Sequence, residues 1–417
     1  MVDTGTAPLS PEDRAILELE CQTIAGHTCK VIVVGPPTPT LQQLRELIGS
    51  RIASVPALTK VLSGEGDALV WAPDLGFDVS RHTDAVPGPP VDDQSLSELV
   101  ASLFQQRLRR DRPLWQLDVA RMDRERVALI WRLHHAVADG TAAMRFAKEL
   151  LWDKEAAVPS RASVRHLDST RDDTRRRGHL AAFFRREFSE SLDTSPFDGK
   201  IGTRRRIAFA AVPFQPLHDA AKKIDGATVN DAVLAVTAGG LRRWLLHHQG
   251  DPGTVRLRVP VSLHSEHDDA GNRDSFFTLP VALDEEDPIV RLRDIHRRTQ
   301  TRKREHDAER REEFMAELGQ ASARLEGFLE RVEACARSFA LCVSNVPGPR
   351  RPVSVLGSPV ESMYSLAEIG RHHALRVAVV SAAGDLCFGL TADPAIVDDL
   401  GEMARGVEAE AEALIAP

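Results

Sequence analysis

The chain has 417 residues, which at roughly 100–200 residues per domain predicts two domains, with three as the upper alternative. Hydrophobic residues make up 42% and charged residues 27%, which is ordinary for a folded globular protein and excludes wholesale disorder. The 53 Lys and Arg residues against 61 Asp and Glu give a net charge of −8. With one Tyr in the whole chain, aromatic and basic residues do not interleave, so we expect no nucleic-acid partner.

The sequence shows neither a membrane span nor a secretion signal. No apolar run approaches bilayer length, and Met1–Arg14 is polar and acidic where a signal peptide would be basic and then apolar. The five cysteines are odd in number and form no C-x-x-C pair, which predicts neither a disulfide framework nor a zinc site. We expect a cytoplasmic protein without a metal; a lipid substrate would leave peripheral association with a membrane or lipid droplet open.

Residues 1–158 are predicted to form a mixed α/β domain. Apolar residues at helical spacing predict three helices, at Leu41–Ser54, Asp92–Arg109 and Thr141–Trp152. Alternation or short apolar runs predict three strands, at Asp67–Trp71, Leu114–Arg121 and Arg126–His134.

Residues 159–205 are predicted to be a charged interdomain linker. They contain the basic cluster Arg175–Arg177 and the first two residues of a second, Arg204–Arg206. They have few periodic apolar positions and one short helical stretch around Leu180–Phe188. Contacts of the arginines with phosphates or acidic lipid are the weaker alternative to a solvated linker.

Residues 206–417 are predicted to form a second α/β domain. Helices are expected at Thr228–Leu246 and Pro288–Phe339, and a polar loop at His264–Ser275. The expected strands are Arg206–Val212, Val255–Val261, Ala340–Ser344, His373–Ser381 and Leu386–Ala392. Strands and helices alternate in both halves, which makes the fold class α/β.

The segment most informative about chemistry is the end of the strand Arg126–His134. There, His134 and His135 are followed by a short apolar turn, and Asp139-Gly140 introduces a helix. A histidine at such a junction is held rigidly and, when neutral, can accept a proton from a hydroxyl or amine. Because successive strand residues face opposite sides, we expect one histidine to be the base and the other to pack or orient.

The other residues of this segment have several interpretations. Asp139 could fix the tautomer of the base or make an ion pair that shapes the turn, and Gly140 fits a position where a side chain would obstruct the chain. A pair of satisfied turn histidines is the plain alternative. A metal site using His135 and Asp139 is weaker still, because the turn looks non-helical and no third ligand is near.

The whole pattern, H-H-x-x-x-D-G, resembles the acyl-transfer signature of chloramphenicol acetyltransferase-like enzymes. Further segments resemble the bacterial wax ester synthase/diacylglycerol acyltransferase (WS/DGAT) family in order along nearly the whole chain. In the first half they are Leu9-Ser10-Pro11, Trp71, Phe77-Asp78, His82 and Arg112-Pro113-Leu114-Trp115. In the second half they are Thr228–Asp231, Pro260-Val261-Ser262, Gly271-Asn272, Leu279-Pro280, Ser344–Pro349 and Gly389–Asp393.

This resemblance implies a two-domain chloramphenicol acetyltransferase-like fold with an active-site tunnel at the domain interface. His135 would be the general base, and Asp139 mainly a structural residue of the motif. Pro113, Leu114 and Trp115 would support the motif and pocket, although a plain core role for Trp115 is an equal alternative.

The resemblance also gives candidate substrate contacts in the second half. For Asn230 and Asp231 the favoured alternative is structural, as a helix N-cap followed by a first-turn Asp. Asn272 and Asn345 could donate to a thioester oxygen, against the alternative of ordinary turn asparagines. One departure is that Leu263-His264 stands where the family usually has Arg, which bears on substrate or CoA contacts.

The implied activity is acyl-CoA-dependent transfer of a fatty acyl group to a hydroxyl, that of a long-chain alcohol or a diacylglycerol, without a cofactor. The first alternative is a secondary-metabolite acyltransferase or condensing enzyme that acylates a small hydroxyl or amine, with CoA or a carrier protein as donor. The second is a non-catalytic lipid-binding homologue. The intact His135, Asp139 and Gly140 argue against it.

Overall fold

The computed structural model describes residues 5–153, 195–224, 226–262, 274–317 and 340–416. Most of the expected linker, with its helical stretch at Leu180–Phe188, lies outside these residues. So do Leu263, His264 and Asn272, and the part of the expected helix Pro288–Phe339 that follows residue 317.

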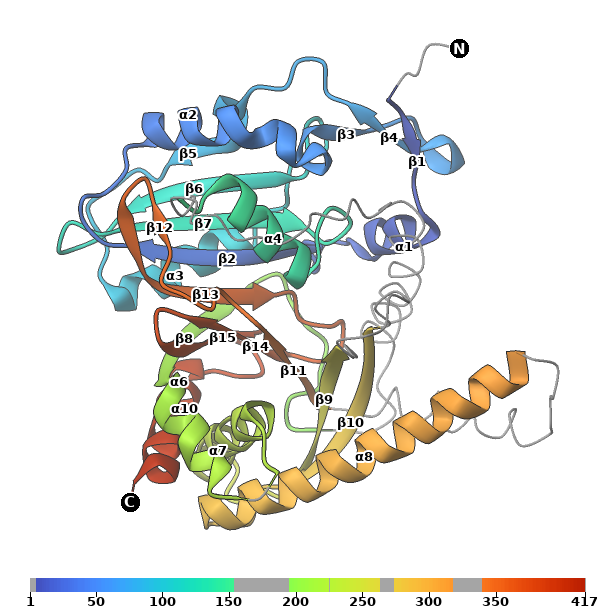
Figure 1. Cartoon of the computed structure of the whole chain (residues 1–417), viewed down its shortest axis with the longest axis vertical. Coiled ribbons are helices and arrows are strands. Elements are labelled where there is room, and N and C mark those ends of the chain that lie inside the picture. The colour runs from blue at the N-terminus through green and yellow to red at the C-terminus, as the bar shows by residue number, and fades with distance from the viewer. Residues whose placement is uncertain (1–4, 154–194, 225, 263–273, 318–339, 417) are drawn as a thin grey trace, which may run out of the picture.

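The first half is built on a six-stranded sheet (Figure 1). Its strands in order are β12 (Ser354–Val355), β13 (Ser358–Ala367), β2 (His27–Val34), β7 (Val127–His134), β6 (Trp115–Arg121) and β5 (Thr83–Ala85). Helices α2 (Leu41–Arg51) and α4 (Gly140–Leu150) bury their apolar residues on one face, and α3 (Asp93–Phe104) covers the other.

Smaller elements surround this sheet. The helix α1 (Pro11–Leu19) lies beside a three-stranded sheet of β1 (Ala7–Pro8), β4 (Val70–Pro73) and β3 (Lys60–Ser63). Four short 3₁₀ helices occupy Ile52–Ser54, Pro56–Thr59, Gly66–Ala68 and Val79–His82.

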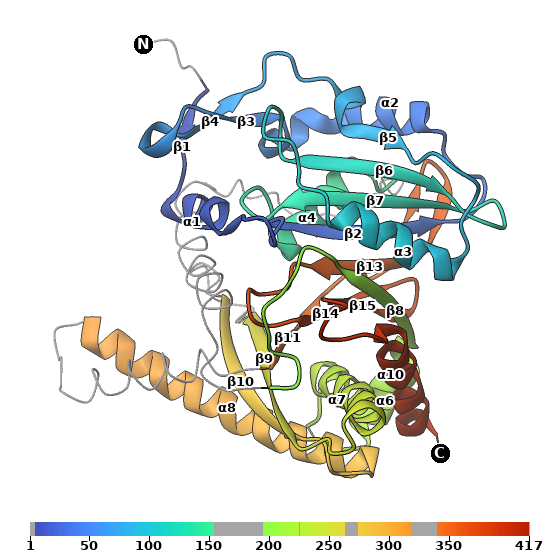
Figure 2. The same ribbon diagram turned by 180° about the vertical axis from the view of Figure 1, so that it is seen from behind.

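The second half has its own six-stranded sheet, seen from behind in Figure 2. Its order is β10 (Asp274–Ala282), β9 (Thr254–Ser262), β11 (Leu341–Val346), β14 (Leu375–Ala382), β15 (Asp385–Ala392) and β8 (Arg206–Pro213). The helices are α6 (Phe214–Lys222), α7 (Val229–His248), α8 (Pro288–Glu317) and α10 (Leu400–Ile415). They pack on the face that points away from the first half, and α7 is buried there continuously over residues 231–241.

The two halves share a strand. β13 comes from the second half of the sequence, yet it pairs antiparallel with β2 in the first sheet, with Leu366 opposite Cys29 (Figure 1). β13 also lies against the second sheet so closely that a Cβ on Gly389 of β15 would be 2.1 Å from the backbone oxygen of Ser365. Residues 206–417 therefore complete a sheet that residues 1–158 begin, and the domain boundaries expected from the sequence remain a proposal.

Most expected elements are confirmed within a few residues, with two local differences. The helix expected over Asp92–Arg109 ends at Phe104, and the strand expected over Asp67–Trp71 begins at Val70, because Gly66–Ala68 forms a 3₁₀ turn. The sequence analysis did not identify the helices α1, α6 and α10, the longer strands β2, β10 and β13, or the short strands β1, β3, β5 and β12.

The close approach of Gly389 to Ser365 gives a test of the packing between the two sheets. Gly389→Ala should destabilise the protein by about 1–3 kcal/mol or more, because the methyl group would meet rigid backbone. The matched control is Gly49→Ala, in an exposed part of α2 where a Cβ meets only Val79 at 3.8 Å, and it should stabilise by about 0.5–1 kcal/mol. Urea unfolding measures both, and a neutral Gly389→Ala would contradict this packing.

Candidate active site

The turn that carries the two histidines is fixed by backbone hydrogen bonds on both sides. His134 ends β7, and its N–H donates to the Leu114 oxygen at 3.0 Å. The His135 N–H donates to the Gly26 oxygen at 3.0 Å, just before β2 begins. The N–H groups of Val137 and Ala138 both donate to the His134 oxygen, which closes the turn (2.9 and 3.1 Å). We call residues 134–138 the catalytic turn, after the role that the resemblance implies for His135.

The His134 ring is immobilised by its surroundings. Its Nδ1 accepts a hydrogen bond from the Ala136 N–H at 3.1 Å, which leaves the other nitrogen to carry the proton of the neutral ring. That nitrogen, Nε2, is 3.8 Å from a carboxylate oxygen of Glu20. Burial, with a smaller contribution from the charge of Arg110, lowers the pKa of His134 to about 3. These contacts fit a packing or orienting role for His134.

The His135 side chain is also buried, with 8% of the residue exposed. Burial lowers the pKa of His135 well below its ordinary value, and the positive charge of Arg376 adds most to this among the neighbouring groups. The ring is therefore neutral at neutral pH, and a neutral imidazole is the form that accepts a proton.

A buried lysine lies close to this site. Lys30, in the middle of β2, has no exposed surface, and its Nζ donates to Ser365 Oγ of β13 at 2.6 Å. Burial lowers the pKa of Lys30 to about 8, although the negative charge of Asp139 acts in the opposite direction. The charge of Lys30 also contributes to the lowered pKa of His135.

Asp139 and Gly140 join the turn to α4. Asp139 is the N-cap of α4: its Oδ1 accepts the Ala142 N–H at 2.6 Å, which agrees with the structural role that the resemblance implied. A Cβ on Gly140 would lie 3.3 Å from Cγ2 of Val346, the last residue of β11. The H-H-x-x-x-D-G motif thus lies against the second half of the chain at the segment that carries Asn345.

Asn345 is held at the end of β11, where it pairs with Val379 of β14. Its side chain is half-buried. The chain then turns tightly against β14, because the Gly348 N–H donates to Ser381 Oγ at 3.0 Å and a Cβ there would be 1.8 Å from the Ser381 oxygen. Asn345 therefore directly precedes Val346, the residue close to Gly140. Its role toward a substrate stays a prediction.

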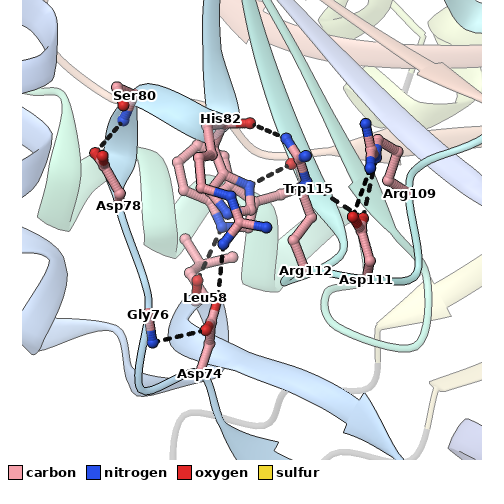
Figure 3. Close-up of polar contacts among 11 residues, drawn as sticks. Leu58, Asp74, Gly76, Asp78, Ser80, His82, Arg109, Asp111, Arg112 and Trp115 are labelled. Atoms are coloured by element: carbon pink, nitrogen blue, oxygen red, sulfur yellow. Dashed lines mark hydrogen bonds and ion pairs between the residues drawn. The ribbon is translucent and has the colours of Figure 1, made fainter.

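Trp115 has the contacts of a core residue (Figure 3). Its indole N–H donates to the Leu58 oxygen at 2.9 Å, and its ring stacks on His82 with centroids 4.5 Å apart. Phe77 stacks on His82 with centroids 5.4 Å apart and also lies 6.5 Å from the Trp115 ring. Residues Phe77, His82 and Trp115, all identified from the sequence, thus form one packed cluster of rings.

Asn230 and Asp231 lie in the first turn of α7. Thr228, and not Asn230 as the sequence analysis considered, is the N-cap, and it forms a capping box with the fully buried Asp231. Asp231 also accepts hydrogen bonds from Thr299 at 2.7 Å and His296 at 3.0 Å. Burial raises the pKa of Asp231, but these hydrogen bonds outweigh it and the net shift is downward. The contacts described for Asp231 are within α7 and α8, which fits the structural alternative.

The sequence analysis missed three buried charged residues around the catalytic turn: Lys30, Glu368 and Arg376. Lys30 carried a detectable signal, a lysine inside the apolar run of β2. Glu368 and Arg376 lie beside the turn only because β13 and β14 bring them there, so no local pattern marks them.

The described residues contain no group of three or more His, Cys, Asp or Glu side chains placed to hold a metal ion. Within the same part of the chain, no helix has the length and apolar character needed to cross a membrane. Four of the five cysteines lie in the described residues, and these four are free thiols.

Two connected six-stranded sheets with the H-H-x-x-x-D-G turn between them define a chloramphenicol acetyltransferase-like fold. The structure is similar to the first condensation domain of the CDA synthetase, with a TM-score of 0.56, 16% identity, and 99% and 97% of the two chains covered. It is more similar to a wax ester synthase/diacylglycerol acyltransferase from Marinobacter aquaeolei VT8, with a TM-score of 0.72, 22% identity and 98% of each chain covered.

The sequence comparisons give the family. Residues 9–186 match the wax ester synthase/diacylglycerol acyltransferase catalytic domain, and residues 270–414 match the WS/DGAT C-terminal domain. A probable diacylglycerol O-acyltransferase from Mycobacterium tuberculosis is 32% identical over 386 residues, covering 83% of this chain and 81% of that protein. This chain belongs to the wax ester synthase/diacylglycerol acyltransferase family, as its motifs indicated.

The capping role of Asp139 is testable. Asp139→Ala should lower the free energy of unfolding by about 0.5–2 kcal/mol, whereas Asp139→Asn should cost much less, because asparagine caps helices as well as aspartate does. Chemical denaturation of both variants provides the comparison. If Asn were as destabilising as Ala, the negative charge facing Lys30, and not the cap, would be what matters at this position.

Proposed function

We propose that this protein is an acyl-CoA-dependent O-acyltransferase that transfers a fatty acyl group to the hydroxyl of a long-chain alcohol or a diacylglycerol. Membership of the WS/DGAT family and the relatives named probable diacylglycerol O-acyltransferases support this proposal. The observation that carries it is the neutral, buried His135 at the end of β7, on a turn fixed by both neighbouring strands. The products would be a wax ester or a triacylglycerol.

The proposed reaction is direct transfer. The His135 imidazole removes the proton from the acceptor hydroxyl as its oxygen attacks the thioester carbonyl carbon. The tetrahedral oxyanion collapses, the carbon–sulfur bond breaks, and the imidazolium returns the proton to the CoA thiolate. Asn345 and Asn272 are proposed donors to the oxyanion, and an active-site tunnel between the halves remains part of the proposal.

The positive charges around His135 act differently before the reaction and in its transition state. Arg376 and Lys30 oppose an isolated imidazolium, which keeps the base neutral before reaction. When the oxyanion forms beside the imidazolium, its negative charge offsets this repulsion, because opposite charges attract more strongly among buried groups than in water. The same cations that weaken the base in the resting state thus favour the transition state.

The assignment of the base is tested by paired substitutions. His135→Ala should lower kcat by about 10²–10⁴-fold, the usual contribution of a general base, and His134→Ala should retain more activity. The assay is thiol release from several acyl-CoAs with long-chain alcohols, diacylglycerol and amines as acceptors, with the ester product identified by mass spectrometry. A larger loss for His134→Ala would move the base to that residue, and turnover with amines alone would favour the condensing-enzyme alternative.

The pH profile provides an independent test. Because the pKa of His135 in the folded protein lies below the ordinary value, its imidazole stays neutral as pH falls through 6.5. The acid limb of kcat/KM should therefore lie well below pH 6.5. Arg376→Met should move that limb upward by removing one cause of the shift. A wild-type acid limb at pH 6.5 or above would be inconsistent with a buried His135 as the base.

A further inference from the structure

A buried ion pair connects residues that are far apart in the sequence behind the catalytic turn. Arg205 Nε donates to Glu368 Oε1 at 2.9 Å, and each side chain is only 2% exposed. Arg205 precedes β8, and Glu368 directly follows β13, the strand that crosses between the halves. Arg205 also donates to the backbone oxygens of Gly202 and Thr23, so its guanidinium is held from several sides.

The carboxylate of Glu368 connects this pair to the backbone that holds His135. Its second oxygen, Oε2, accepts the Ala25 N–H at 2.9 Å. The oxygen of the next residue, Gly26, accepts the His135 N–H at 3.0 Å. Gly26 has a φ of +71°, and a Cβ there would be 2.7 Å from Nε2 of His134. The Glu368 side chain therefore bonds to Ala25, and Ala25 directly precedes Gly26, which contacts both histidines.

Glu368 also bonds to Arg376, the neighbouring charge with the largest effect on the pKa of His135. The Arg376 Nη1 donates to the backbone oxygen of Glu368 at 3.1 Å. A displacement of Glu368 would thus shift the backbone partner of His135 and the cation beside its ring together.

We propose that Arg205 and Glu368 form a positioning pair that sets the location of the His135 imidazole, an inference that rests on the proposed function of His135. Buried ion pairs give little net stability compared with apolar residues of the same size. What such a pair does supply is a fixed set of hydrogen bonds, here directed at Ala25 and Thr23 just ahead of β2. A shift of about 1 Å at a catalytic group can cost about 10²-fold in rate.

The test uses the full chain with Glu368→Gln, which removes the charge at constant shape, and Arg205→Met/Glu368→Gln, which leaves no unpaired buried charge if the single variant folds poorly. The matched control is Glu410→Gln, which breaks a buried ion pair of similar exposure with Arg291, between α8 and α10. Two readouts are needed: kcat and KM from thiol release, and amide hydrogen exchange of residues 24–28 and 134–138 against the rest of the protein.

A positioning role predicts that the Glu368 variants lose about tenfold or more in kcat with KM near the wild-type value. Exchange should accelerate in residues 24–28 and 134–138 beyond any global change. Glu410→Gln should change global exchange without either local effect. Unchanged kcat and unchanged local exchange in the Glu368 variants, or losses no more local than those of Glu410→Gln, would overturn the proposal. If the wild-type chain releases no thiol with any acceptor, the proposed function fails, and the exchange readout still decides whether the pair positions the turn.

Discussion

The pairing of β13 with β2 is the constraint on which the rest of the structure depends. β2 is buried along its whole length, with β7 on one side and β13 on the other. The Thr28 hydroxyl donates across this pairing to the backbone oxygen of Leu366, 338 positions away in the sequence (2.8 Å). Without β13, β2 would be an edge strand with unpaired backbone groups and an exposed apolar surface. The first sheet, and the catalytic turn at the end of β7, are therefore products of both halves.

The same crossing explains the electrostatic character of the site. β13 brings Ser365 to Lys30, and the segment after it brings Glu368 to Ala25 and Arg376 toward His135. Taking ionisable groups out of water favours their neutral forms, which is why the pKa values of both His135 and Lys30 are lowered. The proposed base is thus kept neutral by burial first and by neighbouring cations second.

The parts that the sequence predicts well are those whose pattern is local. The strands β6 and β7, the helix α4 and the H-H-x-x-x-D-G turn follow from alternation, helical spacing and one motif. In contrast, β2 lacks the alternation of a strand with one solvent-exposed face, because both of its faces are buried. Glu368 and Arg205 show no local sequence pattern, because the two residues are 163 positions apart and are brought together only by the tertiary fold. The N-cap expected at Asn230 lies two residues earlier, because Thr228 forms a capping box with Asp231 three residues later, whereas Val233 at the same distance from Asn230 cannot complete one.

The measurement that most directly tests the shared first sheet is native-state hydrogen exchange of the amides in β2, β7 and β13. If β13 is an integral strand, the slowest amides of all three strands should exchange with one common free energy, that of global unfolding. If β13 amides exchanged with a much smaller free energy than those of β2 and β7, the strand would only dock on a sheet that is complete without it. That result would contradict a catalytic turn built jointly by the two halves.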